Sequence, residues 1–328
     1  MSRRVVLVTG SAGLVGHALR AIVGVQHIQR IQPHDQWIWV TRGGAGGTDL
    51  CVWESTRSLF HKYRPTHVIH LAGKVGGMFD NMVHQADYCV ENALMSIHIV
   101  KACHEFGVKR LVVCLSTCIF PEPPPATPMV ETHMHWGPPH PSNAGYAYSK
   151  RFLHALCESY SKQHGLDFVA LVPCNLYGPH DNFGSGAHVL PDLIRKTSEG
   201  IVQHVGTGTA KRQFMYSEDF AAVLLWAAFD HEPMTLEDRT LIVAPDAEHS
   251  IRQVSEYVCK AVSDVTGRVC VDGEWEKETT NDGQAQKRSS AKRLMQLRPN
   301  TSFRDLDKGI RDTVQWFIDS QSRALRRQ

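Results

Sequence analysis

The 328-residue sequence predicts an α/β fold, with a doubly wound, Rossmann-like parallel sheet followed by a second, smaller α/β domain. Short apolar runs rich in β-branched residues recur through the first half of the chain, as in parallel strands that are buried on both faces. Amphipathic stretches separate these runs, with apolar residues every three or four positions. Their alternation indicates a sheet covered by helices on both faces.

Five apolar runs predict the strands. They extend from Val5 to Thr9, Trp37 to Val40, His67 to Leu71, Arg110 to Leu115 and Asp167 to Pro173. Helical spacing predicts helices between them and at the end of the chain. These helices extend from Val90 to Gly107, from Tyr146 to Gly165 and from about Asp307 to Ile318.

Composition and charge exclude several classes of protein. The 35 Lys and Arg residues nearly balance the 33 Asp and Glu residues, so no overall field favours a nucleic acid or a membrane surface as partner. The longest apolar run, Phe220 to Phe229, is about half the length needed to cross a bilayer. Nine cysteines without a CxxC pair suit a reducing compartment, so we expect a protein of the cytoplasm.

A glycine-rich turn follows the first predicted strand and opens a helix. Gly10 permits a tight turn, Gly13 lets the backbone approach a pyrophosphate, and Gly16 lets the helix pack closely on the strand. Leu14 and Val15 begin the helix, whose N-terminus faces the anion. The pattern predicts a dinucleotide site, and a turn that binds nothing is the alternative.

The residue after the second strand distinguishes NAD from NADP. An acidic side chain there holds the ribose hydroxyls of NAD, whereas an arginine suits the additional phosphate of NADP. Arg42 follows this strand, and Asp35 precedes it. We therefore predict NADP (NADPH), the alternative being that Arg42 is a solvated loop charge. We also assign Leu71, Ala72 and Pro173, at the ends of two other strands, to the cofactor site.

Tyr146 and Lys150 are one helical turn apart, so their side chains leave the same face of the helix. A phenol with an ordinary pKa of about 10 is a poor proton relay at neutral pH, and an adjacent ammonium favours its ionised form while holding a nicotinamide ribose. Ser116 follows the fourth strand and can bond a substrate oxygen. A YxxxK pair alone is common on helices, but this combination predicts hydride transfer.

Together these motifs resemble the extended short-chain dehydrogenase/reductase family. Further segments resemble the members that epimerise and reduce GDP-linked 4-keto-6-deoxymannose. These segments are residues 74–77, 115–121, 175–183 and 188–191, and the resemblance extends from Val5 to at least Lys287. It implies epimerisation at C3 and C5, then NADPH-dependent reduction at C4. The order has a physical reason, because the C4 ketone makes the neighbouring C–H groups acidic until reduction removes it.

The resemblance also implies roles for individual residues. Cys118 and His188 would be the base and the acid of epimerisation. Tyr146 would be the proton donor in reduction, supported by Lys150 and Ser116. The residues expected at the nucleotide-sugar substrate are Asn175, His188, Val189, Lys196, Arg212 and Lys287. On this basis we assign residues 1–175 to a dinucleotide-binding domain, to which residues 213–243 return, and residues 176–328 mainly to a substrate-binding domain.

The sequence departs from the family in two places. Val205 stands where a tryptophan is common, and Ala12 stands where some members have an arginine, so phosphate selectivity depends further on Arg42. A histidine cluster at positions 133, 135 and 140 lacks a matching set of carboxylates or cysteines, and we predict no metal.

Two other functions share the same motifs. One is a redox-neutral nucleotide-sugar epimerase that recycles bound NAD(P). The other is a catalytically silent NADPH-sensing binding protein, since a fold does not guarantee turnover. In similar proteins the helices corresponding to residues 90–106 and 146–163 form a four-helix interface, so we also expect a homodimer.

Overall fold

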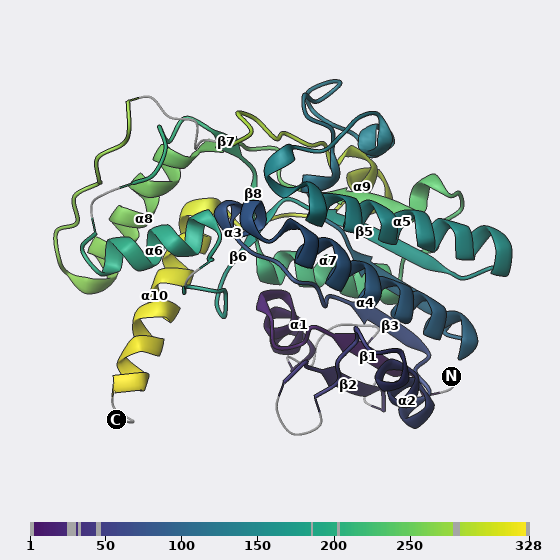
Figure 1. Ribbon diagram of the computed structural model, residues 1–328. Coiled ribbons are helices and arrows are strands. Elements are labelled where there is room, and N and C mark those ends of the chain that lie inside the picture. Colours follow the sequence, from purple (N-terminus) through teal and green to yellow (C-terminus); the bar gives the residue numbers. More distant parts are fainter. Residues whose placement is uncertain are drawn as a thin grey trace.

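The computed structural model describes residues 3–24, 31, 34–43, 47–184, 186–201, 204–277 and 283–325. Its centre is a six-stranded parallel sheet in the order β2-β1-β3-β4-β5-β9 (Figure 1). The strands are β1 (Val5–Thr9), β2 (Gln36–Val40), β3 (His67–His70), β4 (Arg110–Cys114), β5 (Phe168–Pro173) and β9 (Thr240–Val243). The predicted doubly wound parallel sheet is confirmed.

Helices cover both faces of this sheet. They are α1 (Leu14–Gly24), α2 (Trp53–Tyr63), α4 (Gln85–Glu105), α5 (Ala144–His164) and α7 (Ser217–Phe229). Because crossovers between parallel strands are right-handed, the change of direction in strand order at β1 places α1 and α2 on opposite faces. α1 packs against α7, whereas α4 packs against α2 and α5.

The sheet forms the main hydrophobic core. Val6, Leu7 and Val8 of β1 are fully buried, and so is nearly every residue of β5, which explains why these strands read as continuous apolar runs. The helix α5 ends where Gly165 adopts a φ of 70° and donates its N–H to the carbonyl of Ser161.

A second hydrophobic cluster lies beside the sheet, where Figure 1 shows α6 (Val189–Ser198), α8 (Ile251–Thr266) and α10 (Leu306–Leu325) gathered on one side of the molecule. Leu190, Val258 and Val314, one from each of these helices, are buried in it. A capping box of Ser250 and Gln253 begins α8. The division of the chain into two domains remains a prediction.

The remaining elements are short or belong to this second cluster. The strands are β6 (Asn175–Tyr177), β7 (Lys211–Arg212), β8 (Phe214–Tyr216) and β10 (His249–Ser250), and the helices are α3 (Met78–Val83), α6 (Val189–Ser198), α8 (Ile251–Thr266), α9 (Lys292–Leu297) and α10 (Leu306–Leu325). Single turns of 3-10 helix are formed by Thr117–Ile119, Glu131–His135, Pro141–Asn143 and Glu237–Arg239.

The cysteines differ from the sequence expectation in one respect. Cys259 of α8 forms a disulfide with Cys270, whereas the other seven cysteines are free thiols. No helix within the described ranges is long and apolar enough to span a lipid bilayer.

Candidate active site

In the glycine turn after β1, the backbone packs directly against the backbone of neighbouring segments. Gly10 has a φ of 66°, and a Cβ atom there would lie 2.6 Å from the backbone nitrogen of Ala72. A Cβ at Gly16 would lie 2.5 Å from the Cα of Ser11. Both positions therefore need glycine, and the close fit brings the segment that contains Leu71 and Ala72 against the turn.

These segments meet at the carboxyl edge of the sheet. The strand order changes direction between β1 and β3, so the turn that leads into Leu14 and Val15 lies where doubly wound sheets hold ligands. Pro173 is the last residue of β5, and Ser116 follows β4 at the same edge. The N-terminus of α1 and the glycine turn fit a dinucleotide pyrophosphate.

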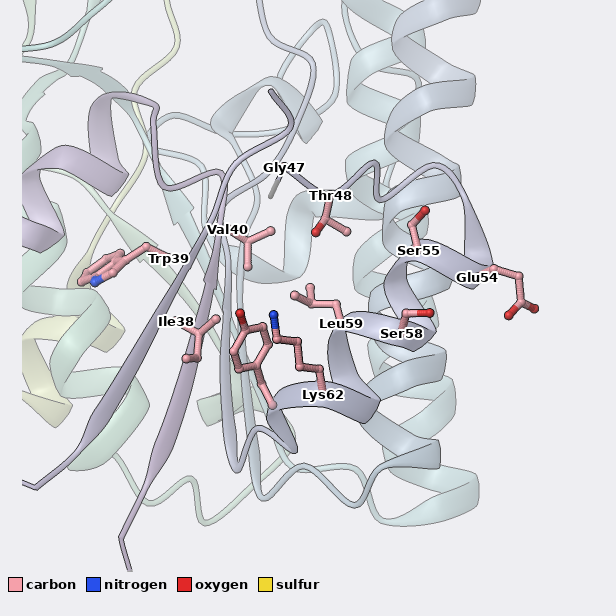
Figure 2. Close-up of a pocket in the computed structure, with 11 residues that line it drawn as sticks. Ile38, Trp39, Val40, Gly47, Thr48, Glu54, Ser55, Ser58, Leu59 and Lys62 are labelled. Atoms are coloured by element: carbon pink, nitrogen blue, oxygen red, sulfur yellow. The ribbon is translucent and has the colours of Figure 1, made fainter. Parts of the chain in front are cut away.

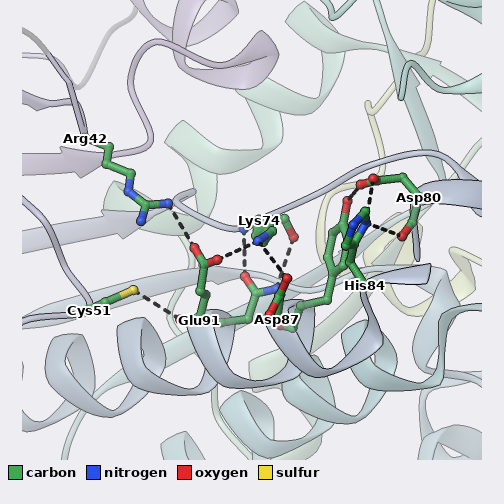
Figure 3. A network of polar contacts seen from close by, with 9 residues as sticks. Arg42, Cys51, Lys74, Asp80, His84, Asp87 and Glu91 are labelled. Atoms are coloured by element: carbon green, nitrogen blue, oxygen red, sulfur yellow. Dashed lines mark hydrogen bonds and ion pairs between the residues drawn. The ribbon is translucent and has the colours of Figure 1, made fainter. Parts of the chain in front are cut away.

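Arg42, which is exposed, belongs to a network of charges (Figure 3). Its Nη1 atom lies 2.9 Å from Oε2 of Glu91, and the other oxygen of this carboxylate lies 2.5 Å from Nζ of Lys74. Lys74 also lies 3.9 Å from Asp87, one turn before Glu91 on α4. Glu91 has no predicted role. The sequence signal that could have pointed to it is an acidic pair with helical spacing, Asp87 and Glu91.

A cavity of about 480 Å³ lies between β2 and α2 (Figure 2). Its lining includes Val40, Thr48, Ser58 and Lys62. None of the predicted catalytic residues lines it. The cavity lies beside β2, the edge strand of the sheet. We therefore define the candidate catalytic site by its side chains and not by this cavity.

Tyr146 and Lys150 of α5 lie beside the end of β4. Lys150 is 5% exposed, and its Nζ atom donates to the carbonyl of Cys114 at 2.9 Å and lies 5.8 Å from the centre of the Tyr146 ring. Burial lowers the pKa of Lys150. Burial also raises the pKa of Tyr146 well above its ordinary value, although a hydrogen bond with Ser116 acts in the opposite direction.

The expectation that Lys150 favours the ionised form of Tyr146 remains a prediction, because burial has the largest effect on the pKa of this phenol. One ammonium donor is directed at a backbone carbonyl, and the cost of burying a phenolate dominates. The phenol is neutral, which suits a proton donor. The ring of Tyr88, a residue without a predicted role, meets Tyr146 edge-on at 6.5 Å, and its hydroxyl bonds to Asp80.

Cys118 lies in the 3-10 turn that follows Ser116. Its backbone N–H donates to Oγ of Ser116 at 3.2 Å, and Nζ of Lys287 lies 3.5 Å from its sulfur. Burial raises the pKa of the thiol, but the charge of Lys287, hydrogen bonds from Ser116 and Lys287, and the charge of Arg212 together lower it. The structure thus places Lys287, which the sequence assigned to the substrate, at the thiol.

His188 immediately precedes α6. Its side chain is accessible to solvent, yet crowding by surrounding protein atoms lowers its pKa. The loop before it is joined to the segment after β3, because the N–H of Gly77 donates to the carbonyl of Gly186 at 2.9 Å. The pairing of His188 with Cys118 remains a prediction.

The other residues predicted at the substrate occupy the second cluster and its border with the sheet. Asn175 donates its backbone N–H to the carbonyl of Gln213, and Val189, the first residue of α6, is 37% exposed. Lys196 forms an ion pair of 2.8 Å with Asp192 on the same helix. Arg212 in β7 bonds through Nη1 to the carbonyl of Lys211 at 2.7 Å. Their contacts with a substrate remain predictions.

The predicted histidine cluster forms local turns. His133 accepts a hydrogen bond from the N–H of Val130, and His140 accepts one from the N–H of Ser142. Among the residues that the structure describes, no three His, Cys, Asp or Glu side chains are placed to hold a metal ion.

The chain belongs to the NAD dependent epimerase/dehydratase family, whose sequence profile matches residues 6–236. A GDP-L-fucose synthase from Dictyostelium discoideum is 38% identical, with 98% of each chain covered, and one from Escherichia coli is 31% identical over 98% of this chain and 99% of the other. The crystal structure of a GDP-L-fucose synthetase from Naegleria fowleri, 33% identical, has a TM-score of 0.83 and covers 98% of this chain and 96% of that one. Within the family, the chain is thus a member of the GDP-L-fucose synthase group.

Another structure of the Naegleria fowleri protein is bound to NADP. It is 32% identical to this chain, with a TM-score of 0.82 and coverage of 98% of this chain and 96% of the other.

Proposed function

We propose that the protein converts GDP-4-keto-6-deoxy-D-mannose to GDP-L-fucose, by epimerisation at C3 and C5 and NADPH-dependent reduction at C4. The observation that carries this proposal is the grouping of a thiol, a neutral phenol and a lysine at one edge of the sheet, in Cys118, Tyr146 and Lys150. Relatives that are named GDP-L-fucose synthase and match this chain over nearly their whole length support it.

The cofactor is NADP(H). Gly10, Gly13 and Gly16 with Leu14 and Val15 would hold its pyrophosphate at the start of α1. Leu71, Ala72 and Pro173 would line the dinucleotide, Lys150 would hold the nicotinamide ribose, and Arg42 would meet the 2′-phosphate. When bound, NADPH supplies the hydride for C4.

Epimerisation needs a base and an acid on opposite sides of the sugar. Cys118, as a thiolate, takes the proton from the carbon beside the ketone, and the electron pair of that C–H bond moves into an enolate. His188 then returns a proton to the other face. After both groups exchange protons with solvent, they act in the same way at the second carbon.

Reduction needs a proton for the oxygen at C4. Tyr146 donates this proton, and the raised pKa of its buried phenol keeps the proton in place until the oxygen becomes negative. Ser116 forms hydrogen bonds with the C4 oxygen and with the phenol of Tyr146. Lys150 stabilises the negative charge that Tyr146 acquires, because its ammonium lies on the same face of α5.

The remaining predicted residues hold the substrate. Lys196, Arg212 and Lys287 would contact the diphosphate, with Arg212 able to offer a two-pronged guanidinium. Asn175 and Val189 would line the sugar.

We also propose a cytoplasmic homodimer. Val90 and Ile97 of α4 are exposed, as are Tyr148 and Phe152 of α5, so the neighbouring helices present apolar side chains that a second copy could cover. Seven of the nine cysteines are free thiols, which suits a reducing compartment, whereas Cys259 and Cys270 form a disulfide. Sedimentation of purified protein would give the mass of a dimer, and a monomer at micromolar concentration would contradict the proposal.

One incubation tests the proposed reaction against its rivals. With GDP-4-keto-6-deoxymannose and NADPH, we expect one NADPH to be consumed for each GDP-L-fucose formed. Epimerised keto sugar without loss of NADPH absorbance would identify a redox-neutral epimerase. Binding of NADPH without any product would identify a silent cofactor-binding protein.

A further inference from the structure

A lysine from a distant part of the chain contacts the sulfur of Cys118. Nζ of Lys287 donates to Sγ at 3.5 Å, although 169 residues separate the two in the sequence. Both residues are half-buried. In a partly desolvated site an ammonium at this distance attracts a thiolate much more strongly than a neutral thiol.

The backbone around Lys287 is anchored on both sides. Two residues earlier, the carbonyl of Ala285 accepts the N–H of Lys211 at 2.8 Å. One residue later, the carbonyl of Arg288 accepts the N–H of Met129 at 2.9 Å. These bonds tie the lysine to β7 and to the loop that leads away from the Cys118 turn. The contact is therefore built from three separate parts of the fold.

We propose that Lys287 is a positioning residue that stabilises the thiolate of Cys118 and so prepares the base of epimerisation. The reaction that this serves rests on the proposed function, whereas the effect on the thiol does not. An ammonium has three donors, and the thiol occupies one of them. Lys287 can thus hold Cys118 while its other donors remain available to a substrate phosphate.

The groups around Cys118 shift the pKa of its thiol in opposite directions. Burial raises the pKa of the thiol most strongly, and Lys287 has the largest opposing effect, ahead of Arg212. Ser116 accepts the N–H of Cys118 and also bonds Tyr146, whose phenol is neutral. Without Lys287, burial would be opposed only by the weaker effects of Ser116 and Arg212, so the pKa of the thiol would rise and its thiolate fraction would fall.

The test measures the thiol directly, without a nucleotide sugar. Iodoacetamide is uncharged, and its reaction rate with a cysteine follows the thiolate fraction. Mass spectrometry of the Cys118 peptide separates this site from the other cysteines, with Cys118→Ser as the blank. In Lys287→Met, we expect the midpoint of alkylation against pH to rise by about one unit or more, which slows alkylation about tenfold below the midpoint.

Two control variants separate charge from structure. Lys287→Arg keeps the cation and should keep the midpoint of the unmodified protein. Lys292→Met removes an exposed charge a few residues later in the chain and should leave the midpoint unchanged. Folding is checked by circular dichroism and by NADPH binding. An unchanged midpoint in folded Lys287→Met, even with a raised KM for the substrate, would overturn the inference. A shifted midpoint without turnover on GDP-4-keto-6-deoxymannose would reject the proposed function alone.

Discussion

The two ends of the site use positive charge differently. At the cofactor end, Arg42 is 68% exposed and already paired with Glu91, so a phosphate must compete with a carboxylate for it. At the catalytic end, the half-buried Lys287 faces a thiol that carries charge only when it ionises. An exposed ion pair contributes about 0–1 kcal/mol, whereas a cation beside a buried acid changes its protonation. Substitutions at the two ends should therefore differ in kind as well as in size.

The largest expected effect is at the catalytic end. Cys118→Ser should slow exchange of the C3 and C5 hydrogens with deuterium oxide by about 10³-fold, because a hydroxyl is a far weaker base than a thiolate. In the unmodified protein, exchange should fall as pH decreases through the Cys118 pKa, which lies below its ordinary value, because the thiolate is then lost. NMR of the keto sugar measures both. Normal exchange in the serine variant would remove Cys118 from the mechanism.

A second substitution separates reduction from epimerisation at the same end. Tyr146→Phe should lower NADPH oxidation by about 10²-fold or more, because the oxygen at C4 loses its proton donor. Solvent exchange at C3 and C5 should remain measurable, since Cys118 is intact. Stopped-flow absorbance and NMR on one preparation follow the two steps. Equal loss of both in folded protein would contradict the assigned division of roles.

At the cofactor end the expected effect is smaller and selective. Arg42→Gln should raise the KM for NADPH by about tenfold, as expected for a lost hydrogen bond to a charged group, and should leave the KM for NADH unchanged. Steady-state kinetics with both cofactors measure the ratio. A similar loss with NADH would mean that Arg42 supports the loop rather than the 2′-phosphate.

The smallest expected effect has the opposite sign. Glu91→Gln removes the carboxylate that competes for Arg42 and Lys74, so NADPH should bind up to about fivefold more tightly. Added salt should reduce the gain, because Arg42 is exposed and the other two groups are partly accessible to solvent. Fluorescence titration at two salt concentrations tests this. Weaker binding in the variant would show that Glu91 orients Arg42 instead of competing for it.

Local sequence predicted most of the sheet. Continuous runs of β-branched residues predicted the bounds of these strands to within one or two residues, because strands buried on both faces have a clear apolar pattern. The bounds of the helices were predicted less accurately than those of the strands. The helix expected from Val90 begins at Gln85, since its first turn is polar, and the last helix continues from Ile318 to Leu325.

The site was harder to predict because its contacts are not local. The Tyr146 and Lys150 pair follows from helical spacing, but the bond from Lys150 to the carbonyl of Cys114 depends on how α5 packs on β4. The approach of Lys287 to Cys118 joins residues with no shared pattern. The sequence identifies the chemical groups of the site, whereas their pKa shifts depend on contacts that form only when the chain folds.

We propose that one site performs both epimerisation and reduction. A single turnover in deuterium oxide with unlabelled NADPH tests this proposal most directly. We expect one NADPH to be oxidised per molecule of product, and we expect the GDP-L-fucose to carry deuterium at C3 and C5 but hydrogen at C4. Reduced product without deuterium at those two carbons, or deuterated product without oxidation of NADPH, would contradict it.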